Sequence, residues 1–336
     1  MNTRILIATG IYPPHVGGPA HYAQELKNSL EKLDNTVSVA TYGIERKIPA
    51  GLRHIVYFLR AISSLWGVEC IIALDTLSTG VPAVWAARIT GKKIIVRTGG
   101  DFLWETYVER TGEKIPLPEF YKLKRNLSLK EKIIFRLTKN LLNNANAIVF
   151  STEWQRDIFA EGYDFDKQKA FIVENFYGKK TKNTIPDEKK FLWAGRTIIL
   201  KNTDTLNVAF NKAKEKVGGI TLELLTDIPH GALMEKIRKC YALVVPSISD
   251  ISPNLVLEGI MFGKPFILTR YTGLQKRLAG CGIFIDPLNA SELAEQFVYL
   301  ADQNHYNEYV EHIARFSYTH SYDEIARELL EIYKTT

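Results

Sequence analysis

The fold of this chain is indicated by the stretch ALVVPSISDISPNLVLE, which occupies residues 242–258. A short apolar run typical of a buried strand is followed by a polar loop and then by a second apolar run with helix-like character. Such β-like and helix-like stretches alternate from one end of the chain to the other, which is the pattern of a parallel α/β sheet. Strands are expected at Arg4–Thr9, Thr36–Thr41, Glu69–Leu74, Lys93–Arg97, Ala147–Ser151, Ala170–Val173, Phe191–Ala194, Thr221–Leu225, Ala242–Pro246, Pro265–Leu268 and Gly282–Ile285.

The alternation is interrupted by the polar stretch Lys179–Lys190, which reads as an interdomain linker. At 336 residues the chain is long enough for two domains. We therefore expect an N-terminal Rossmann-like domain at residues 1–178, a second Rossmann-like domain at 179–317, and a C-terminal helix within 318–336. Ligands of parallel sheets bind beyond the carboxyl ends of the strands, so two such sheets facing one another predict a ligand cleft between the domains.

Composition is that of a globular protein, with 46% hydrophobic and 24% charged residues. The cysteines Cys70, Cys240 and Cys281 are widely spaced in or beside apolar stretches, and we expect them to be buried free thiols in a reducing compartment. The sequence shows neither a signal peptide nor a run of about 20 apolar residues that could span a membrane. These features predict a cytoplasmic protein, with a peripheral contact at the inner face of the membrane left open.

A local concentration of positive charge suggests where such a membrane contact could arise. The net charge is +6, and many cations fall in one segment that also carries apolar residues at helix-like spacing. A basic amphipathic helix can lie on anionic lipid, and the alternative is a packed surface helix with a solvated basic face. Nucleic acid is not an expected partner, because the net charge is modest and no reader motif appears. The cations are Lys122, Lys124, Arg125, Lys130, Lys132, Arg136 and Lys139.

Two motifs suggest a site for a diphosphate. The stretch YPPHVGGP at residues 12–19 places Gly17 and Gly18 between a strand and a helix, where glycines allow close backbone approach and the helix N-terminus attracts anions. Arg196 and Lys201 lie on a later strand-to-helix loop. The arginine fork and the mobile lysine can converge on one anion and stabilise the charge that develops on a leaving group. A tight turn and two solvated surface cations are the alternative interpretations.

A third motif places two carboxylates, Asp250 and Glu258, on either side of a proline-containing loop that opens a helix. Asp250 would face a sugar at the helix mouth, and Glu258, two turns along, would grip a diol such as ribose. After Pro253, the free backbone N–H groups of Asn254 and Leu255 would point at phosphate. The alternative is an N-cap aspartate and an unrelated helix glutamate.

In their order along the chain, these motifs resemble glycosyltransferase family 4, a group of retaining enzymes with the GT-B fold. The resemblance rests on Pro-Pro-x-x-Gly-Gly, Gly-Arg-x4-Lys and Asp-x7-Glu, and the likeness spans almost the whole chain. It implies two Rossmann-like domains whose parallel sheets face an interdomain cleft. It also implies transfer of a sugar from a UDP- or GDP-type nucleotide sugar to a hydroxyl of a saccharide or lipid-linked acceptor, in cell-surface polysaccharide or glycolipid synthesis.

The same resemblance implies roles for single residues. Arg196 and Lys201 would hold the donor diphosphate, Asp250 would contact the transferred sugar, and Glu258 would bind the ribose. The C-terminal helix Tyr322–Tyr333 would cross back onto the N-terminal domain. No metal or other cofactor is implied, because the cationic side chains do the work of a metal. The implied donor-binding residues are Gly17, Gly18, Arg196, Lys201, Asp250, Pro253, Asn254, Leu255 and Glu258.

The sequence departs from the family pattern at two sites. Asp250 stands where the family usually has the longer glutamate, and Gly99 stands where many relatives have a histidine close to the transferred sugar. Asp101 is the candidate to take over that contact, and the alternative is a turn capped by Asp101. Retention could proceed by front-face attack, with the donor phosphate accepting the acceptor proton. The candidate catalytic residues are Asp101, Asp250, Arg196 and Lys201.

Two further functions fit the same residues. Gly99 in place of histidine favours a non-catalytic nucleotide-sugar binder, and a nucleotide-sugar epimerase can share the GT-B architecture. Asp164-Phe165-Asp166 matches the metal-binding D-x-D motif of glycosyltransferases of another fold. It follows a helix in a charged loop, and we expect no metal there.

Overall fold

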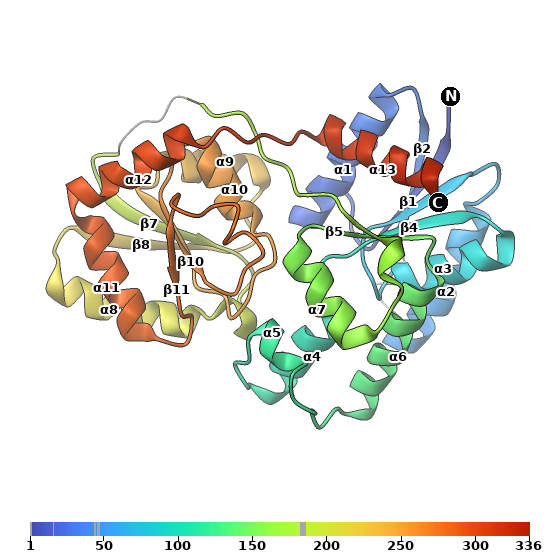
Figure 1. Ribbon diagram of the computed structural model, residues 1–336, viewed down its shortest axis with the longest axis horizontal. Coiled ribbons are helices and arrows are strands. Elements are labelled where there is room, and N and C mark those ends of the chain that lie inside the picture. The colour runs from blue at the N-terminus through green and yellow to red at the C-terminus, as the bar shows by residue number, and fades with distance from the viewer. Residues whose placement is uncertain (1, 16, 44, 46–47, 182–185) are drawn as a thin grey trace. The chain divides into compact units, whose positions relative to one another are not determined.

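The computed structural model describes residues 2–15, 17–43, 45, 48–181 and 186–336. The chain packs as two compact units (Figure 1). The first unit comprises residues 1–106, 124–174 and 321–336, and the second comprises 107–123 and 175–320. The segment 107–123 thus packs with the second unit, although in the sequence it lies inside the expected N-terminal domain.

The first unit is built on a six-stranded parallel sheet. Its strands are β1 (Arg4–Thr9), β2 (Thr36–Thr41), β3 (Cys70–Ala73), β4 (Lys93–Arg97), β5 (Ala147–Phe150) and β6 (Ala170–Ile172). Their order across the sheet is β2-β1-β3-β4-β5-β6. β1 lies between two partners, with Ile5 aligned to Val37 on one side and to Cys70 on the other. The inner strands β1, β3, β4 and β5 are almost completely buried, as expected for a parallel sheet that helices cover on both faces, whereas the edge strands β2 and β6 are partly exposed.

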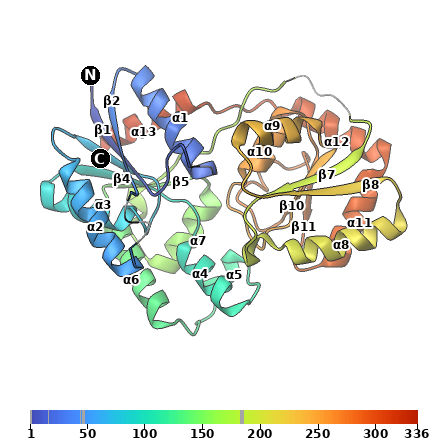
Figure 2. The same cartoon turned by 180° about the vertical axis from the view of Figure 1, so that it is seen from behind.

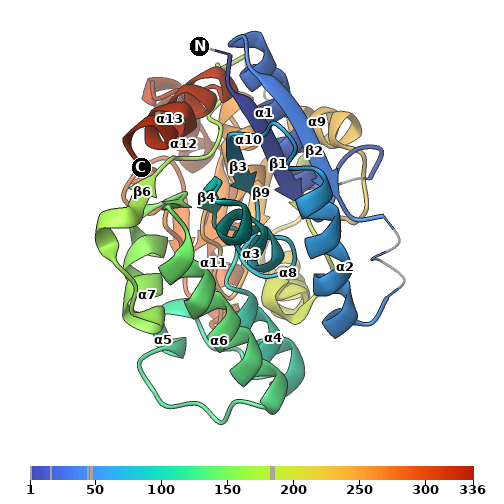
Figure 3. The same ribbon diagram turned by 90° about the vertical axis from the view of Figure 1, so that its right-hand side faces the viewer.

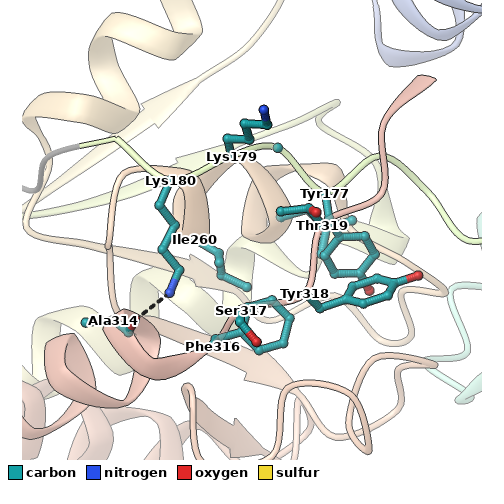
Figure 4. A pocket seen from close by; sticks show the side chains of 11 residues that line it. Tyr177, Lys179, Lys180, Ile260, Ala314, Phe316, Ser317, Tyr318 and Thr319 are labelled. Carbon is teal, nitrogen blue, oxygen red and sulfur yellow. Dashed lines mark hydrogen bonds between the residues drawn. The ribbon is translucent and has the colours of Figure 1, made fainter. Parts of the chain in front are cut away.

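Helices lie on both faces of this sheet (Figure 3). The helices of the unit are α1 (Gly18–Lys32), α2 (Ala50–Ser63), α3 (Gly80–Thr90), α6 (Leu129–Asn144), α7 (Glu153–Tyr163) and the C-terminal α13 (Tyr322–Thr335), together with the first part of α4 (Phe102–Thr111). α1 packs against α13, so the C-terminal helix belongs to the first unit. α3 packs against both α2 and α6, which makes one layer of these three helices. α4 begins in the first unit and ends in the second.

The basic segment expected to form one amphipathic helix is helical only in its second part. α6 begins after Ser128, whose hydroxyl accepts a hydrogen bond from the backbone N–H of Glu131, while the Glu131 carboxylate accepts one from the N–H of Ser128. This reciprocal capping box fixes the helix start at Leu129. The cations ahead of that start lie outside the helix: Lys122, Lys124 and Arg125.

The second unit is built on a five-stranded parallel sheet with the order β11-β10-β9-β7-β8. The strands are β7 (Lys189–Ala194), β8 (Ile220–Leu225), β9 (Ala242–Val245), β10 (Phe266–Thr269) and β11 (Ile283–Ile285). Successive side chains alternate between two cores. In β7, Phe191 and Trp193 point into one core while Leu192 points into the other. Every strand expected from the sequence is confirmed within a few residues at each end.

Two sets of helices form these two cores in the second unit (Figures 1 and 2). The helices are α5 (Leu117–Phe120), α8 (Thr203–Lys216), α9 (His230–Lys239), α10 (Asn254–Met261), α11 (Ala290–Ala301) and α12 (Gln303–Arg315). α8 and α11 supply one core, α9 and α10 supply the other, and α12 contributes Tyr306 to the first and Ile313 to the second. Among the described residues, no helix is long and apolar enough to cross a membrane.

Candidate functional site

The candidate site lies at the edge of the second sheet where its parallel strands end. β7 pairs with β8 on one side and with β9 on the other, and β9 pairs with β10. Because the strands are parallel, the loops that follow them gather at one edge, where sheets of this kind bind ligands. Arg196 and Lys201 follow β7, His230 follows β8, and Asp250 and Glu258 follow β9.

The loop after β7 is fixed by a buried asparagine. Asn202 has a positive φ of 56° and is 1% exposed. Its Nδ2 donates to the carbonyl of Pro246, at 3.1 Å, and to that of Pro287, at 2.7 Å, so it ties the loop to the ends of two other strands. A short 3-10 turn, Ile199–Lys201, precedes it and positions Lys201. Arg196, on the same loop, is exposed.

Lys201 and Asp250 form an ion pair, as the convergence of these loops predicts. Lys201 Nζ lies 2.7 Å from Asp250 Oδ2, and the two side chains are 27% and 16% exposed. The Ser247 hydroxyl is 3.3 Å from the same carboxylate oxygen. The backbone N–H of Asp250 donates to the carbonyl of Tyr271, which holds the loop beside the chain that follows β10. The pair is therefore partly screened from water and fixed from both sides.

The start of α10 forms the next part of this edge. Pro253 is its N-cap residue and Asn254 its first residue. Asn175 Nδ2 donates to the Ser252 carbonyl, at 3.1 Å, and to Asn254 Oδ1, at 3.0 Å, so it clamps the turn into the helix. The first N–H groups of a helix, here including that of Leu255, have no intrahelical acceptor and attract anions.

The Ser252 hydroxyl lies in this turn with an unmet hydrogen-bonding capacity. Its oxygen is buried and has no hydrogen-bond partner among the described residues. Leaving a buried polar group unpaired costs about 1–3 kcal/mol. An oxygen of a bound anion would remove this cost. The sequence motif contains Ser252, but its spacing gave no reason to single it out.

Glu258 lies two turns into α10 and pairs with a histidine that the sequence motifs did not indicate. His230 Nε2 is 2.9 Å from Glu258 Oε1, and the side chains are 37% and 15% exposed. His230 is the first residue of α9 and follows Pro229 directly. The contact leaves the second carboxylate oxygen of Glu258 for a ligand and fixes the orientation of the group. A proline-histidine step at a helix start after β8 was the available sequence signal.

The inserted segment 107–123 forms one wall of the loop after β7. Lys114 Nζ is 2.8 Å from Asn202 Oδ1 and 2.5 Å from the Asp204 carboxylate. The Ser249 hydroxyl accepts a hydrogen bond from the N–H of Leu117 at 2.9 Å. The segment 107–123 thus contacts both the loop after β7, which carries Lys201, and the loop after β9, which carries Asp250. No local sequence pattern could have indicated these contacts, because the partners are far apart in the chain.

The glycine motif of the first unit opens α1. Gly17 has a φ of 140°, a conformation that other residues rarely adopt, and Gly18 begins the helix. The N–H groups of Ala20 and His21 already bind the Gly17 carbonyl. Val16, within the motif, lies outside the described residues. The geometry fits the expected glycine-rich helix start, and the donor contact of Gly17 and Gly18 stays a prediction.

Asp101 has the structural role that was the alternative to catalysis. It is 1% exposed, and its Oδ1 accepts hydrogen bonds from the N–H groups of Leu103 and Trp104 at the start of α4. The Tyr163 hydroxyl donates to the same oxygen at 3.1 Å. Asp101 therefore caps α4 from a buried position. A further role in catalysis stays a prediction.

The D-x-D motif of the first unit is occupied by local contacts. Asp164 ends α7 with a positive φ of 50°, and its carboxylate lies 3.3 Å from Lys139. Asp166 accepts a hydrogen bond from the N–H of Gln168 and caps the short 3-10 turn Lys167–Lys169. In the described part of the chain, no group of three or more histidine, cysteine or acidic residues could hold a metal ion.

Comparison with known proteins bears on the fold. No protein-family model matches the chain, and no curated protein matches it in sequence. The structure of sucrose-phosphate synthase from Thermosynechococcus elongatus is similar, with a TM-score of 0.72 and 14% identity over 99% of both chains. Anabaena HepE in complex with UDP-glucose gives a TM-score of 0.71 and 11% identity over 100% of both chains. A glycosyltransferase from Rickettsia africae gives a TM-score of 0.64 and 13% identity over 99% of this chain and 98% of the other.

The chain has the GT-B fold. This confirms the fold predicted from the order of the motifs. At such identities the likeness extends to the architecture alone, and membership of glycosyltransferase family 4 stays a prediction.

Proposed function

We propose that this protein is a retaining glycosyltransferase of family 4. It would move a sugar from a UDP- or GDP-type nucleotide sugar to a hydroxyl of a saccharide or lipid-linked acceptor. The Lys201–Asp250 pair carries the proposal, because a cation and a carboxylate 2.7 Å apart match the two neighbouring parts of such a donor. The ammonium suits the diphosphate, and the carboxylate suits the hydroxyls of the sugar attached to it.

The surroundings of the pair support the same ligand. The N-terminus of α10 and the Ser252 hydroxyl offer hydrogen-bond donors for phosphate. Glu258, oriented by His230, offers carboxylate oxygens for a ribose diol. The GT-B neighbour HepE, crystallised with UDP-glucose, supports a nucleotide sugar as the donor.

In this proposal the protein acts by placing charge where it develops. As the bond between sugar and diphosphate breaks, negative charge grows on the leaving phosphate, and Arg196 and Lys201 stabilise it. The acceptor hydroxyl attacks from the face that the phosphate leaves, and the phosphate accepts its proton. Retention follows from this front-face geometry. Because the two cations meet the diphosphate charge, the proposal includes no metal ion.

The cellular setting belongs to the same proposal. A hydroxyl acceptor on a saccharide or lipid carrier would place the enzyme in cell-surface polysaccharide or glycolipid synthesis. The protein would act in the cytoplasm, with a peripheral contact at the inner face of the membrane.

Calorimetric titration with UDP, GDP, ADP and their sugar conjugates tests the donor class. The chosen sugar conjugate is then incubated with acceptor sugars, and NMR of the anomeric proton reports transfer and its stereochemistry. Binding without turnover for every acceptor would favour the non-catalytic binder suggested by Gly99. Conversion of the free nucleotide sugar without an acceptor would favour the epimerase. Failure of every nucleotide to bind would refute the proposal.

A further inference from the structure

Helix α2 of the first unit exposes a stripe of large apolar side chains. Leu52, Ile55 and Leu59 are 57%, 54% and 59% exposed, although they recur at the spacing of one helix face. The opposite face, with Tyr57 at 0% exposed, packs into the unit. Trp66, in the turn that follows the helix, is 97% exposed. A single exposed leucine is ordinary on a protein surface, but an aligned set with a fully exposed tryptophan marks a binding surface.

Figure 3 shows the backbones of α2, α3 and α6, and exposed side chains of α6 add apolar surface and positive charge to this layer. α3 packs against α2 and α6, and α6 adds Leu129 and Ile133, which are 76% and 47% exposed. The cations Lys130, Lys132 and Arg136 are exposed on α6 and form no ion pair with any described residue.

Acidic side chains are almost missing from this layer. The one acidic residue within α2, α3 and α6 is Glu131, which is 0% exposed and occupied in the capping box. Outside these three helices, Glu45 pairs with Arg60 of α2, and the exposed Asp164 pairs with Lys139 of α6. The solvent face of the three helices is therefore apolar and positive.

We propose that the α2–α3–α6 face binds an anionic lipid bilayer. Large aliphatic side chains and a tryptophan enter the boundary between headgroups and acyl chains, and lysine and arginine side chains attract anionic headgroups. A second copy of the chain is a poorer occupant, because a two-fold contact would set the same positive surface against itself. The inference deepens the proposed function, on whose peripheral membrane contact it rests, and vesicle binding tests it separately from donor binding. The basic segment of the sequence suggested a membrane contact through α6 alone. The proposal adds the apolar stripe of α2, a helix that has no cluster of cations.

Co-sedimentation with vesicles tests the proposal on the full chain. We expect binding to vesicles of equal parts phosphatidylcholine and phosphatidylglycerol, weak binding to phosphatidylcholine alone, and a decrease as salt screens the charges. Trp66 gives a direct readout, since its emission should shift to the blue when lipid surrounds it. The shift should be lost in Trp66→Phe, which preserves an aromatic side chain.

Two sets of variants separate the apolar and the charged contributions. Leu59→Gln combined with Trp66→Ala should weaken vesicle binding roughly tenfold or more, because two inserted side chains are removed. Leu288→Gln is its control, since Leu288 is an apolar residue of similar exposure, 48%, in the second unit.

The charge set replaces the three exposed cations of α6 by glutamine. This triple variant should also weaken binding to anionic vesicles by roughly tenfold or more. A matched triple variant on α8, at Lys212, Lys214 and Lys216, removes the same net charge and should have a much smaller effect. All of these side chains are exposed, so far-UV circular dichroism should show an unchanged fold.

Three results would overturn the proposal. The first is no binding to anionic vesicles at low salt. The second is equal weakening by the α6 and α8 triple variants, which would mean that net charge alone attracts the protein. The third is a dimer in size-exclusion chromatography that dissociates in the α2 variant while vesicle binding is unchanged, which would make this face an interface between copies.

Discussion

Replacing Asp250 by asparagine should have opposite effects on the nucleotide and on the nucleotide sugar. In the structure the Asp250 carboxylate lies 2.7 Å from the Lys201 ammonium. To bind there, a diphosphate must first break the ion pair between Lys201 and Asp250. Its negative charge then lies close to the Asp250 carboxylate, which repels it. Asp250→Asn removes both costs, so the bare nucleoside diphosphate should bind more tightly.

The magnitude follows from the burial of the pair. A hydrogen bond to a charged group contributes about 1.5–3 kcal/mol to stability, and the side chains of this pair are 27% and 16% exposed. Partial exposure lowers this figure to about 1–2 kcal/mol. At 1.4 kcal/mol for each factor of ten, the nucleoside diphosphate should bind roughly five- to thirtyfold more tightly.

The sugar conjugate should not share this gain. In the proposal the Asp250 carboxylate accepts hydrogen bonds from sugar hydroxyls, and asparagine replaces them with weaker, neutral ones. The affinity of the nucleotide sugar relative to the nucleotide should therefore fall about tenfold or more, and the transfer rate should fall with it. Calorimetric titration of both ligands measures the ratio directly.

A double-mutant cycle assigns the effect to the pair. Lys201→Ala alone should weaken the nucleoside diphosphate by about 2–5 kcal/mol, because the diphosphate loses a cation and meets an unpaired carboxylate. Adding Asp250→Asn should recover part of this loss. Asp157→Asn is the control, since it changes the same charge in an exposed ion pair of the first unit. An unchanged or weaker affinity for the nucleoside diphosphate in a folded Asp250→Asn protein would refute the reasoning.

Three further predictions use other parts of the chain. Glu258→Ala should weaken a nucleoside diphosphate roughly tenfold or more and His230→Ala by less, whereas inorganic pyrophosphate, which has no ribose, should bind each variant as it binds the parent protein; an equal loss for pyrophosphate in calorimetry would contradict the ribose role. Gly99→Ala should change the free energy of unfolding by less than about 0.5 kcal/mol, because the new methyl group meets open space, whereas Gly80→Ala places it 2.1 Å from a backbone oxygen and should cost about 1–3 kcal/mol or more in urea denaturation. Burial raises the pKa of the Cys70 thiol to about 12, so at pH 8 it stays protonated and should react with a disulfide reagent only after unfolding; rapid labelling of the native protein would show that the thiol is accessible.

The strands and the loops that carry Lys201 and Asp250 could be predicted because their signals are local. A short apolar run between turn residues identifies a strand, and the parallel order then brings the loops of Lys201 and Asp250 to one edge. The start of α6 was not predicted, although Ser128 and Glu131 have the spacing of a capping box. The expected helix began too early in the sequence, because the cations ahead of Ser128 were counted as part of it.

The missed features depend on contacts between distant parts of the chain. The step Pro229-His230 places the histidine at a helix start, but it does not indicate that its side chain meets Glu258. Lys114 and Leu117 lie in a stretch between β4 and β5 whose partners come from loops about a hundred residues later, and burial and hydrogen bonding there are decided by packing. Asp101 was predicted to contact the sugar or acceptor; it caps α4, and the catalytic contact stays a prediction.

The insertion of 107–123 into the second unit has a consequence for engineering. A recombinant fragment that begins at Asn175 would lack Lys114 and Leu117, so Asn202, Asp204 and Ser249 would lose partners that the intact chain provides. Chimaeras that exchange the C-terminal half to alter sugar preference should therefore carry this short peptide from the same parent. Chimaeras that are divided at the linker alone would combine the segment 107–123 of one parent with the loops after β7 and β9 of the other. If such a chimaera failed to fold, the failure would not report on how the loops recognise a sugar.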